Sequence, residues 1–179
     1  SKNFKIENMK NYFYFSFLIL LVNCTNNLPE AKISDIRVTN LQLEYYNQLT
    51  LHFDSNINLD SLNKNATAAM SFTLYCPLDG SSDFDIEKMP FKKYFISSST
   101  IKKESNKNKY YADFHISKGD TISGSGDRYI AEKEEIIDLL KNKECIPCKV
   151  YTTFYFTGRE PYFSKQFCIP AQDVIKALE

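Results

Sequence analysis

The sequence predicts a mainly β protein, an antiparallel β-sandwich of loosely immunoglobulin-like form with one inserted helix and a short C-terminal helix. Apolar and polar residues alternate in about seven segments, which is typical of strands with one buried face. The strand–helix–strand rhythm of a parallel sheet is absent. The chain also contains 12 Tyr and 14 Phe, which favour strands. An α+β sheet with a helix on one face is the alternative, and the tryptophan typical of immunoglobulin domains is missing.

The first part of the chain supplies five of the strand patterns, at residues 33–46, 49–53, 70–76, 91–99 and 110–116. The first pattern changes phase near Asn40, which predicts a β-bulge or a switch between sheets. We expect Asn47 and Gln48 to form a hairpin turn, so that the first two strands pair antiparallel. The polar residues 54–69 are expected to form a loop with one helical turn near Leu59.

The last third of the chain contains the clearest helical pattern, at residues 129–143. Its acidic residues come early and its basic residues late, which suits the helix dipole. Strand patterns follow at residues 150–157 and 162–169, with a turn at 158–161 between them. Pairing these strands would place Cys168 near Tyr151. Pro170 begins a predicted C-terminal helix, whose apolar stripe consists of Val174, Ile175 and Leu178.

Residues 9–24, M-K-N-Y-F-Y-F-S-F-L-I-L-L-V-N-C, have the order of an export signal that ends in a cysteine. Lys10 supplies the positive end, and residues 12–22 form an apolar run interrupted only by Ser16. A membrane-spanning helix needs about 20 apolar residues, whereas a signal needs about 7–15. We therefore expect a signal peptide at residues 1–23 that is removed, a lipidated tether at 24–32 and a single β-rich domain at 33–179.

Leu21-Val22-Asn23-Cys24 resembles a bacterial lipobox, in which small or apolar residues precede a cysteine. Asn23 departs from the usual small residue, and such relaxed sequences are similar to those of spirochaetal outer-surface lipoproteins. The resemblance covers only the signal. It implies that Cys24 is diacylated and becomes the mature N-terminus, and that the protein is held on the cell envelope and contacts host proteins. The alternative is a buried N-terminal helix or strand in which Cys24 is a core thiol.

Four further cysteines are present, namely Cys76, Cys145, Cys148 and Cys168. An even number in an exported protein favours structural disulfides, and the sequence leaves all three pairings open. Cys145 and Cys148 also form a C-x-x-C motif. A redox pair of this kind normally follows a strand and begins a helix, the reverse of the order predicted here. A zinc site would need a second close pair, which Cys76 and Cys168 do not form.

Charge and motif content limit the classes of function. The 22 basic residues balance 22 acidic ones, so no basic excess favours nucleic acid as a partner. Asp83, Asp85 and Glu87 lack the Gly and the distal Glu of an EF-hand loop and are expected to form a solvated acidic loop. His52 and His115 lie in strand patterns without a ligand or catalytic partner at suitable spacing. We therefore expect no metal, no cofactor and no enzymatic activity.

These observations predict a lipid-anchored protein of the bacterial envelope, exposed at the outer membrane surface, that acts as an antigen- or adhesin-like binding module. Its expected partners are the membrane, through the N-terminal lipid, and a host or envelope protein. The loops at residues 77–90 and 117–128 are the expected binding loops. The alternative is a periplasmic thiol-disulfide protein that uses Cys145 and Cys148.

Overall fold

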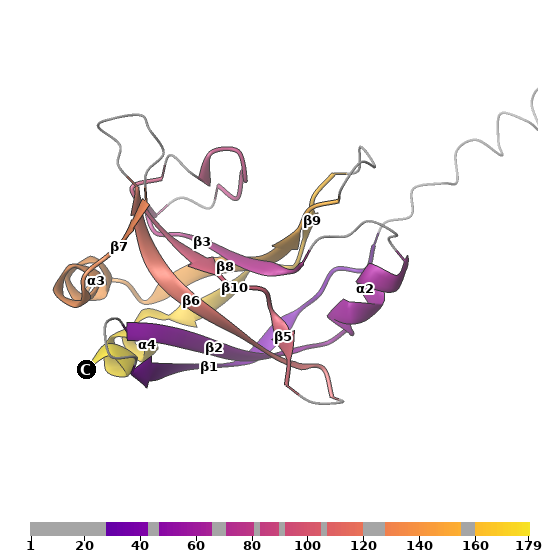
Figure 1. Cartoon of the computed structure of the whole chain (residues 1–179), viewed down its shortest axis with the longest axis horizontal. Helices are drawn as coiled ribbons and strands as arrows, with labels where there is room; N and C mark the ends of the chain where they lie inside the picture. The colour runs from indigo at the N-terminus through magenta and orange to yellow at the C-terminus, as the bar shows by residue number, and fades with distance from the viewer. Residues whose placement is uncertain are drawn as a thin grey trace, which may run out of the picture.

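The computed structural model describes residues 28–42, 47–65, 71–80, 83–89, 92–104, 107–119, 128–154 and 160–179. The predicted signal peptide, the predicted lipidation site Cys24 and the first part of the tether lie outside these residues. The described residues form an antiparallel sheet with three helices (Figure 1), which confirms the predicted mainly β fold.

The strands are β1 (Ile33–Gln42), β2 (Asn47–Ser55), β3 (Thr73–Pro77), β4 (Tyr94–Ser98), β5 (Lys102–Lys103), β6 (Lys109–Gly119), β7 (Arg128–Ile130), β8 (Cys145–Thr152), β9 (Tyr162–Phe163) and β10 (Phe167–Pro170). The helices are α2 (Leu59–Asn65), α3 (Lys133–Leu140) and α4 (Ala171–Leu178). The strands follow the order β1-β2-β6-β4-β3-β8-β10, while β5 and β7 pair with β6 and β9 pairs with β8. The long strand β6 crosses obliquely between the pair β1 and β2 and the group β3, β8 and β10 (Figure 1). The sheet is therefore connected throughout, and its curvature gives a sandwich- or barrel-like arrangement.

The hydrophobic core lies inside this curved sheet and follows the predicted alternation. β2 buries Leu49, Leu51 and Phe53, and β6 buries Tyr110, Ala112, Phe114 and Ile116. Burying a Leu, Ile or Phe side chain stabilises the fold by about 1.5–3 kcal/mol relative to leaving it exposed. Helix α4 adds Val174, Ile175 and Leu178, the stripe that the sequence predicts. The helical turn expected near Leu59 is present as α2.

Two predictions about the first hairpin are wrong. The irregularity in β1 lies where the register passes from Ser34 to Arg37, not near Asn40. Asp35 has a φ of 50° there, a left-handed conformation that Asp tolerates better than most residues. Asn47 is paired with Gln42 inside the β1–β2 ladder, so the predicted turn at Asn47 and Gln48 is in fact the start of β2.

The second half of the chain differs from the prediction in its boundaries. Helix α3 begins at Lys133, since Arg128–Ile130 forms β7 against the end of β6. Strand β8 begins at Cys145 and therefore contains the whole C-x-x-C motif, which was expected in the connection before the strand.

The final predicted strand is divided into β9 and β10. Cys168 lies opposite Pro147, while Phe163 lies opposite Tyr151, so the predicted register is wrong. Ser164 explains the break. Its N–H donates to the Val150 carbonyl at 2.8 Å, and its Oγ accepts the Val150 N–H at 2.9 Å. The Ser164 hydroxyl takes the place of a backbone acceptor for the Val150 N–H, and the register of pairing with β8 therefore changes between β9 and β10.

The register places the start of β1 and strand β7 at opposite ends of the sheet. Ile33 pairs with Ser55 at the end of β2, whereas β7 pairs with the last residues of β6. We call the end where β1 begins the proximal end and the other the β7 end. Figure 1 shows α2 and β9 on the right and β7 and α3 on the left.

The chain is fixed to the domain before β1 begins. Ala31 is fully buried, and its N–H donates to the Tyr162 hydroxyl at 2.9 Å. That hydroxyl donates to the Pro29 carbonyl at 3.0 Å, and the Lys165 N–H donates to the Ala31 carbonyl at 2.8 Å. The last residues of the expected tether are thus held against the connection between β9 and β10.

Candidate binding surface

The four cysteines of the domain form two disulfides, Cys76–Cys148 and Cys145–Cys168. Cys76 and Cys148 are fully buried and lie on the neighbouring strands β3 and β8, with 4.3 Å between their Cα atoms. Cys145 and Cys168 join β8 to β10, with a Cα–Cα distance of 5.5 Å. This structure therefore selects one of the three pairings that the sequence leaves open.

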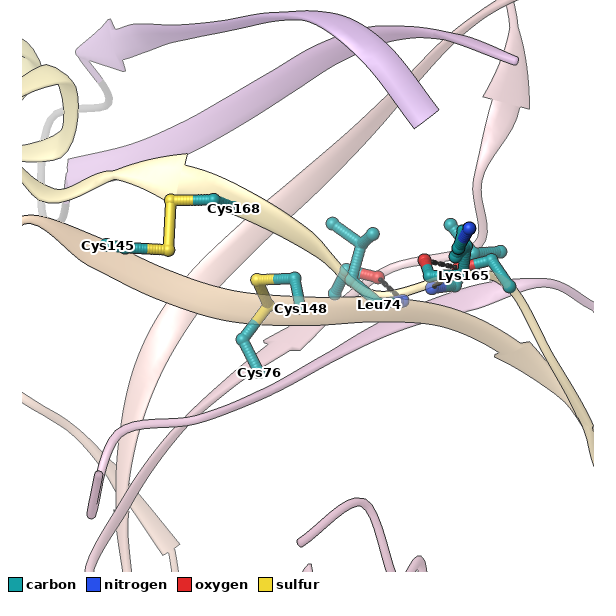
Figure 2. Close-up of a disulfide and its surroundings, with 9 residues drawn as sticks. Leu74, Cys76, Cys145, Cys148, Lys165 and Cys168 are labelled. Atoms are coloured by element: carbon teal, nitrogen blue, oxygen red, sulfur yellow. Dashed lines mark hydrogen bonds between the residues drawn. A yellow bond between two sulfur atoms is a disulfide. The ribbon is translucent and has the colours of Figure 1, made fainter. Parts of the chain in front are cut away.

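The two cysteines of the C-x-x-C motif form disulfides with cysteines on two different strands (Figure 2). Side chains alternate between the faces of a strand, so residues three apart point to opposite sides. Cys148 points into the core, and Cys145 is exposed. Their bonds therefore connect β3, β8 and β10 in one row. In the part of the chain that the structure describes, no three His, Cys, Asp or Glu side chains lie together as a metal site.

The two predicted binding loops leave the sheet at the β7 end. The Leu78 N–H donates to the Tyr94 carbonyl at 3.2 Å, and the Gly119 N–H donates to the Lys93 carbonyl at 3.0 Å. Strand β4 lies between β3 and β6, so both connections start beside it. Residues 120–127 of the second loop lie outside the described residues.

The first loop is held on the outer face of the sheet by Phe84. Its ring lies edge-on to Tyr75, and the Lys149 ammonium lies 4.8 Å from its centroid. Burial, together with the nearby carboxylates Asp79, Asp83 and Asp85, raises the pKa of Tyr75 to about 12.

The acidic side chains of this loop are partly neutralised. Lys88 lies 3.3 Å from Asp83 and 3.2 Å from Asp85, and Lys92 lies 2.7 Å from Asp79. A backbone hydrogen bond from Asp85 and the Lys88 ammonium lower the pKa of Asp83. The arrangement agrees with the expected solvated acidic loop.

Strand β7 carries the two exposed large hydrophobic side chains of the described residues. Tyr129 is 60% exposed and Ile130 is 50% exposed. Tyr129 lies opposite Lys118 and Ile130 lies opposite Ser117, so their side chains project from opposite faces of the strand. Together with two hollows beside the strand, they define what we call the β7 surface.

The sequence prediction missed this surface because Ile130 fits a helical stripe. It precedes Ile137 by seven residues, the spacing of two helical turns. A second signal points to a strand. Arg128, Tyr129 and Ile130 follow a stretch with three glycines at positions 119, 124 and 126, and an aromatic residue next to a β-branched one favours a strand after such a loop.

An acidic hollow of about 540 Å³ lies beside β7 and is lined by Tyr129 and, in part, by Ile130. Its charged lining consists of Lys118, Glu132, Glu134 and Glu135, so one positive charge faces three negative ones and the net charge is −2. The Lys118 ammonium lies 2.7 Å from Glu135, whose carboxylate also accepts the Tyr94 hydroxyl. These two donors, Lys118 first, lower the pKa of Glu135. Glu132 and Glu134 are exposed and form no ion pair with any described residue.

A second hollow of about 400 Å³ lies beside Ile130. Ser98, Ser99 and Phe114 contribute to its wall, together with Asp113 and His115. Asp113 accepts the Thr50 hydroxyl at 2.7 Å. His115 is half-buried, and burial lowers the pKa of its imidazole, so the ring is neutral near pH 7. This hollow is therefore less charged than the one beside Tyr129.

Comparison with protein-family models, curated proteins and solved structures returned no match for this chain. None of the helices that the structure describes has the length and apolar character needed to cross a membrane. The β7 surface offers an aromatic and an apolar side chain on one short strand, and beside them, at the start of α3, two carboxylates that form no ion pair with any described residue. Such groups suit recognition of another molecule.

Proposed function

We propose that this chain is a lipid-anchored protein of the bacterial envelope, exposed at the outer membrane surface, that acts as a binding module for a host or envelope protein. The observation that carries the binding role is the exposure of both Tyr129 and Ile130 on an edge strand. The anchor would be Cys24, at the end of the lipobox-like stretch. The role is binding rather than catalysis and needs no cofactor.

Two features of the domain support this proposal. Its two disulfides suit a protein that folds in an oxidising compartment outside the cytoplasm. The segment at Ala31 that leads back to Cys24 lies at the proximal end, and the β7 surface lies at the other. A lipid at Cys24 would therefore leave the β7 surface accessible to a partner.

Lipidation is tested by growing bacterial cells that produce the full chain with radioactive palmitate. We expect the label on the wild-type protein, with the protein in the membrane fraction, and neither result for Cys24→Ala. Cys145→Ala together with Cys168→Ala is the matched control, because it removes two other cysteines and should retain the label. An unlabelled wild-type protein, or a Cys24→Ala protein that stays in the membrane, would contradict the proposed anchor.

Surface exposure is tested separately by adding protease to intact cells. We expect loss of the protein under conditions that spare a periplasmic marker. A protein that is protected until the outer membrane is permeabilised would place the anchor on the periplasmic side.

The second candidate is a periplasmic thiol-disulfide protein, favoured by the exposure of Cys145. An external thiolate could attack an exposed sulfur more readily than a buried one. However, Cys145 and Cys148 point to opposite faces and bond to different strands, so this function would require an exchange of partners. Reduction of insulin disulfides by dithiothreitol that the wild-type protein accelerates, with the acceleration lost in Cys145→Ala, would support this candidate.

A further inference from the structure

The backbone of β7 presents hydrogen-bonding groups away from the sheet. The Ala131 N–H donates to the Ile116 carbonyl at 2.9 Å, and Ile130 lies opposite Ser117. In an antiparallel ladder this register makes Tyr129 bond to Lys118 through the backbone. The N–H and C=O groups of Arg128 and Ile130 therefore point outward. Among the described residues no strand pairs with this edge.

The Arg128 side chain leaves the outward edge open. Its guanidinium carbon lies 5.2 Å from the centroid of the Phe95 ring, so the side chain lies back over the sheet. Gly119, which is opposite Arg128 in the ladder, has no side chain in its path. Unpaired edges of this kind can receive an additional strand.

The charge beside the outward edge of β7 indicates which kind of segment can bind there. Tyr129 provides an exposed ring, and Glu132 and Glu134 provide two carboxylates in the hollow of charge −2 that form no ion pair with any residue the structure describes. A Lys or Arg side chain satisfies both features, because its stem packs on the ring and its charged end reaches the carboxylates. A second copy of β7 would bring another hollow of the same charge against this one, which is unfavourable.

We infer that β7 receives an extended segment of another protein, which pairs with the outward backbone of Arg128 and Ile130. A Lys or Arg of that segment faces Tyr129 and Glu132, and its apolar residues face Ile130. This inference rests on the proposed binding function and specifies the chemistry of the partner at that site.

The probe is a synthetic peptide of six residues in which Arg and Val alternate, titrated into the full acylated chain in neutral detergent. We expect saturable binding, measured by fluorescence anisotropy of the labelled peptide. Glu132→Gln combined with Glu134→Gln should weaken binding about tenfold, the scale of one charge-assisted hydrogen bond. The matched control is Glu30→Gln with Glu160→Gln, which makes the same charge change at exposed sites and should leave affinity unchanged.

The strand-pairing step has its own variant. The Ile130 N–H points away from β6, so Ile130→Pro removes an outward donor without removing a bond of the ladder. We expect this variant to lose binding while its circular dichroism spectrum and melting temperature stay close to those of the wild type. If it does not fold, the same step is tested with a peptide whose alternate backbone amides are N-methylated, which should not bind to the wild type.

Four outcomes would overturn the inference. They are no binding at about 1 mM peptide, equal weakening by the two pairs of Glu variants, unchanged binding of the N-methylated peptide, and a dimer in sedimentation that Ile130→Pro abolishes. The last result would make the occupant a second copy. Because acylation is measured by palmitate labelling, failure of peptide binding is distinguishable from failure of the proposed anchor.

Discussion

The half-buried imidazole of His115 links a single residue to the pH dependence of the whole fold. Burial disfavours the charged ring, so the pKa of His115 lies below its ordinary value of 6.5. Between that ordinary value and the lowered one, the unfolded chain binds a proton that the folded chain does not. The free energy of unfolding must therefore fall as the pH decreases through this range.

We expect His115→Gln to reduce the loss of stability between pH 7.5 and pH 5. The substitution removes the proton that binds to the unfolded state alone, while carboxylates elsewhere titrate as before. Melting temperatures of both proteins across this range provide the measurement. Parallel curves would show that the His115 pKa is not lowered by folding.

The hydroxyl of Tyr162 also acts at the scale of one residue, because it bonds to two backbone groups. Tyr162→Phe should lower the free energy of unfolding by about 1–3 kcal/mol, since the buried Ala31 N–H loses its partner. Urea denaturation measures the change. Tyr151→Phe is the matched control, because no hydrogen bond of its hydroxyl is present among the described residues, and it should change stability much less. Equal effects of the two substitutions would contradict the role of the Tyr162 hydroxyl.

At the scale of elements, the two disulfides should differ in their contribution. Cys76–Cys148 closes a loop of 72 residues and Cys145–Cys168 closes one of 23. Chain entropy then gives about 4 kcal/mol for the first and about 3 kcal/mol for the second. We expect Cys76→Ala with Cys148→Ala to destabilise more than Cys145→Ala with Cys168→Ala, measured by urea denaturation under non-reducing conditions. The opposite order would mean that packing around Cys145 and Cys168 outweighs loop entropy.

The individual strands show which parts of the fold could be predicted from the sequence and which could not. Alternation located β2 and β6, since both bury one face against the core. It failed at β7, because three residues are too few for a period of two to be recognised. It also failed at the C-x-x-C motif, which was expected before the strand but lies inside β8 and is paired with β10.

The candidate site could be predicted only in part from the same sequence patterns. The sequence located the loops at residues 77–90 and 117–128, and the register places their starting points at the same end of the sheet. The disulfide pairing and the exposure of Tyr129 both depend on which strands are neighbours. Contacts between distant parts of the chain decide this, and a local pattern does not contain that information.

For the whole molecule, the proximal end and the β7 end give the domain a direction. β6 has 11 residues and extends from one end toward the other. A strand of that length spans about 36 Å. The β7 surface and the segment at Ala31 are thus separated along most of the domain.

The hydrogen bond from Tyr162 to the Pro29 carbonyl limits the distance between the domain and the bilayer. With Cys24 acylated, only residues 25–28 separate the lipid-bearing residue from this fixed point, and the fully extended chain from Cys24 to Pro29 is about 18 Å long. This short connection limits how far the domain can move from the membrane and how freely it can rotate. A partner would then meet β7 within a narrow band of heights above the lipid headgroups, and Tyr162→Phe would widen that band by releasing more chain.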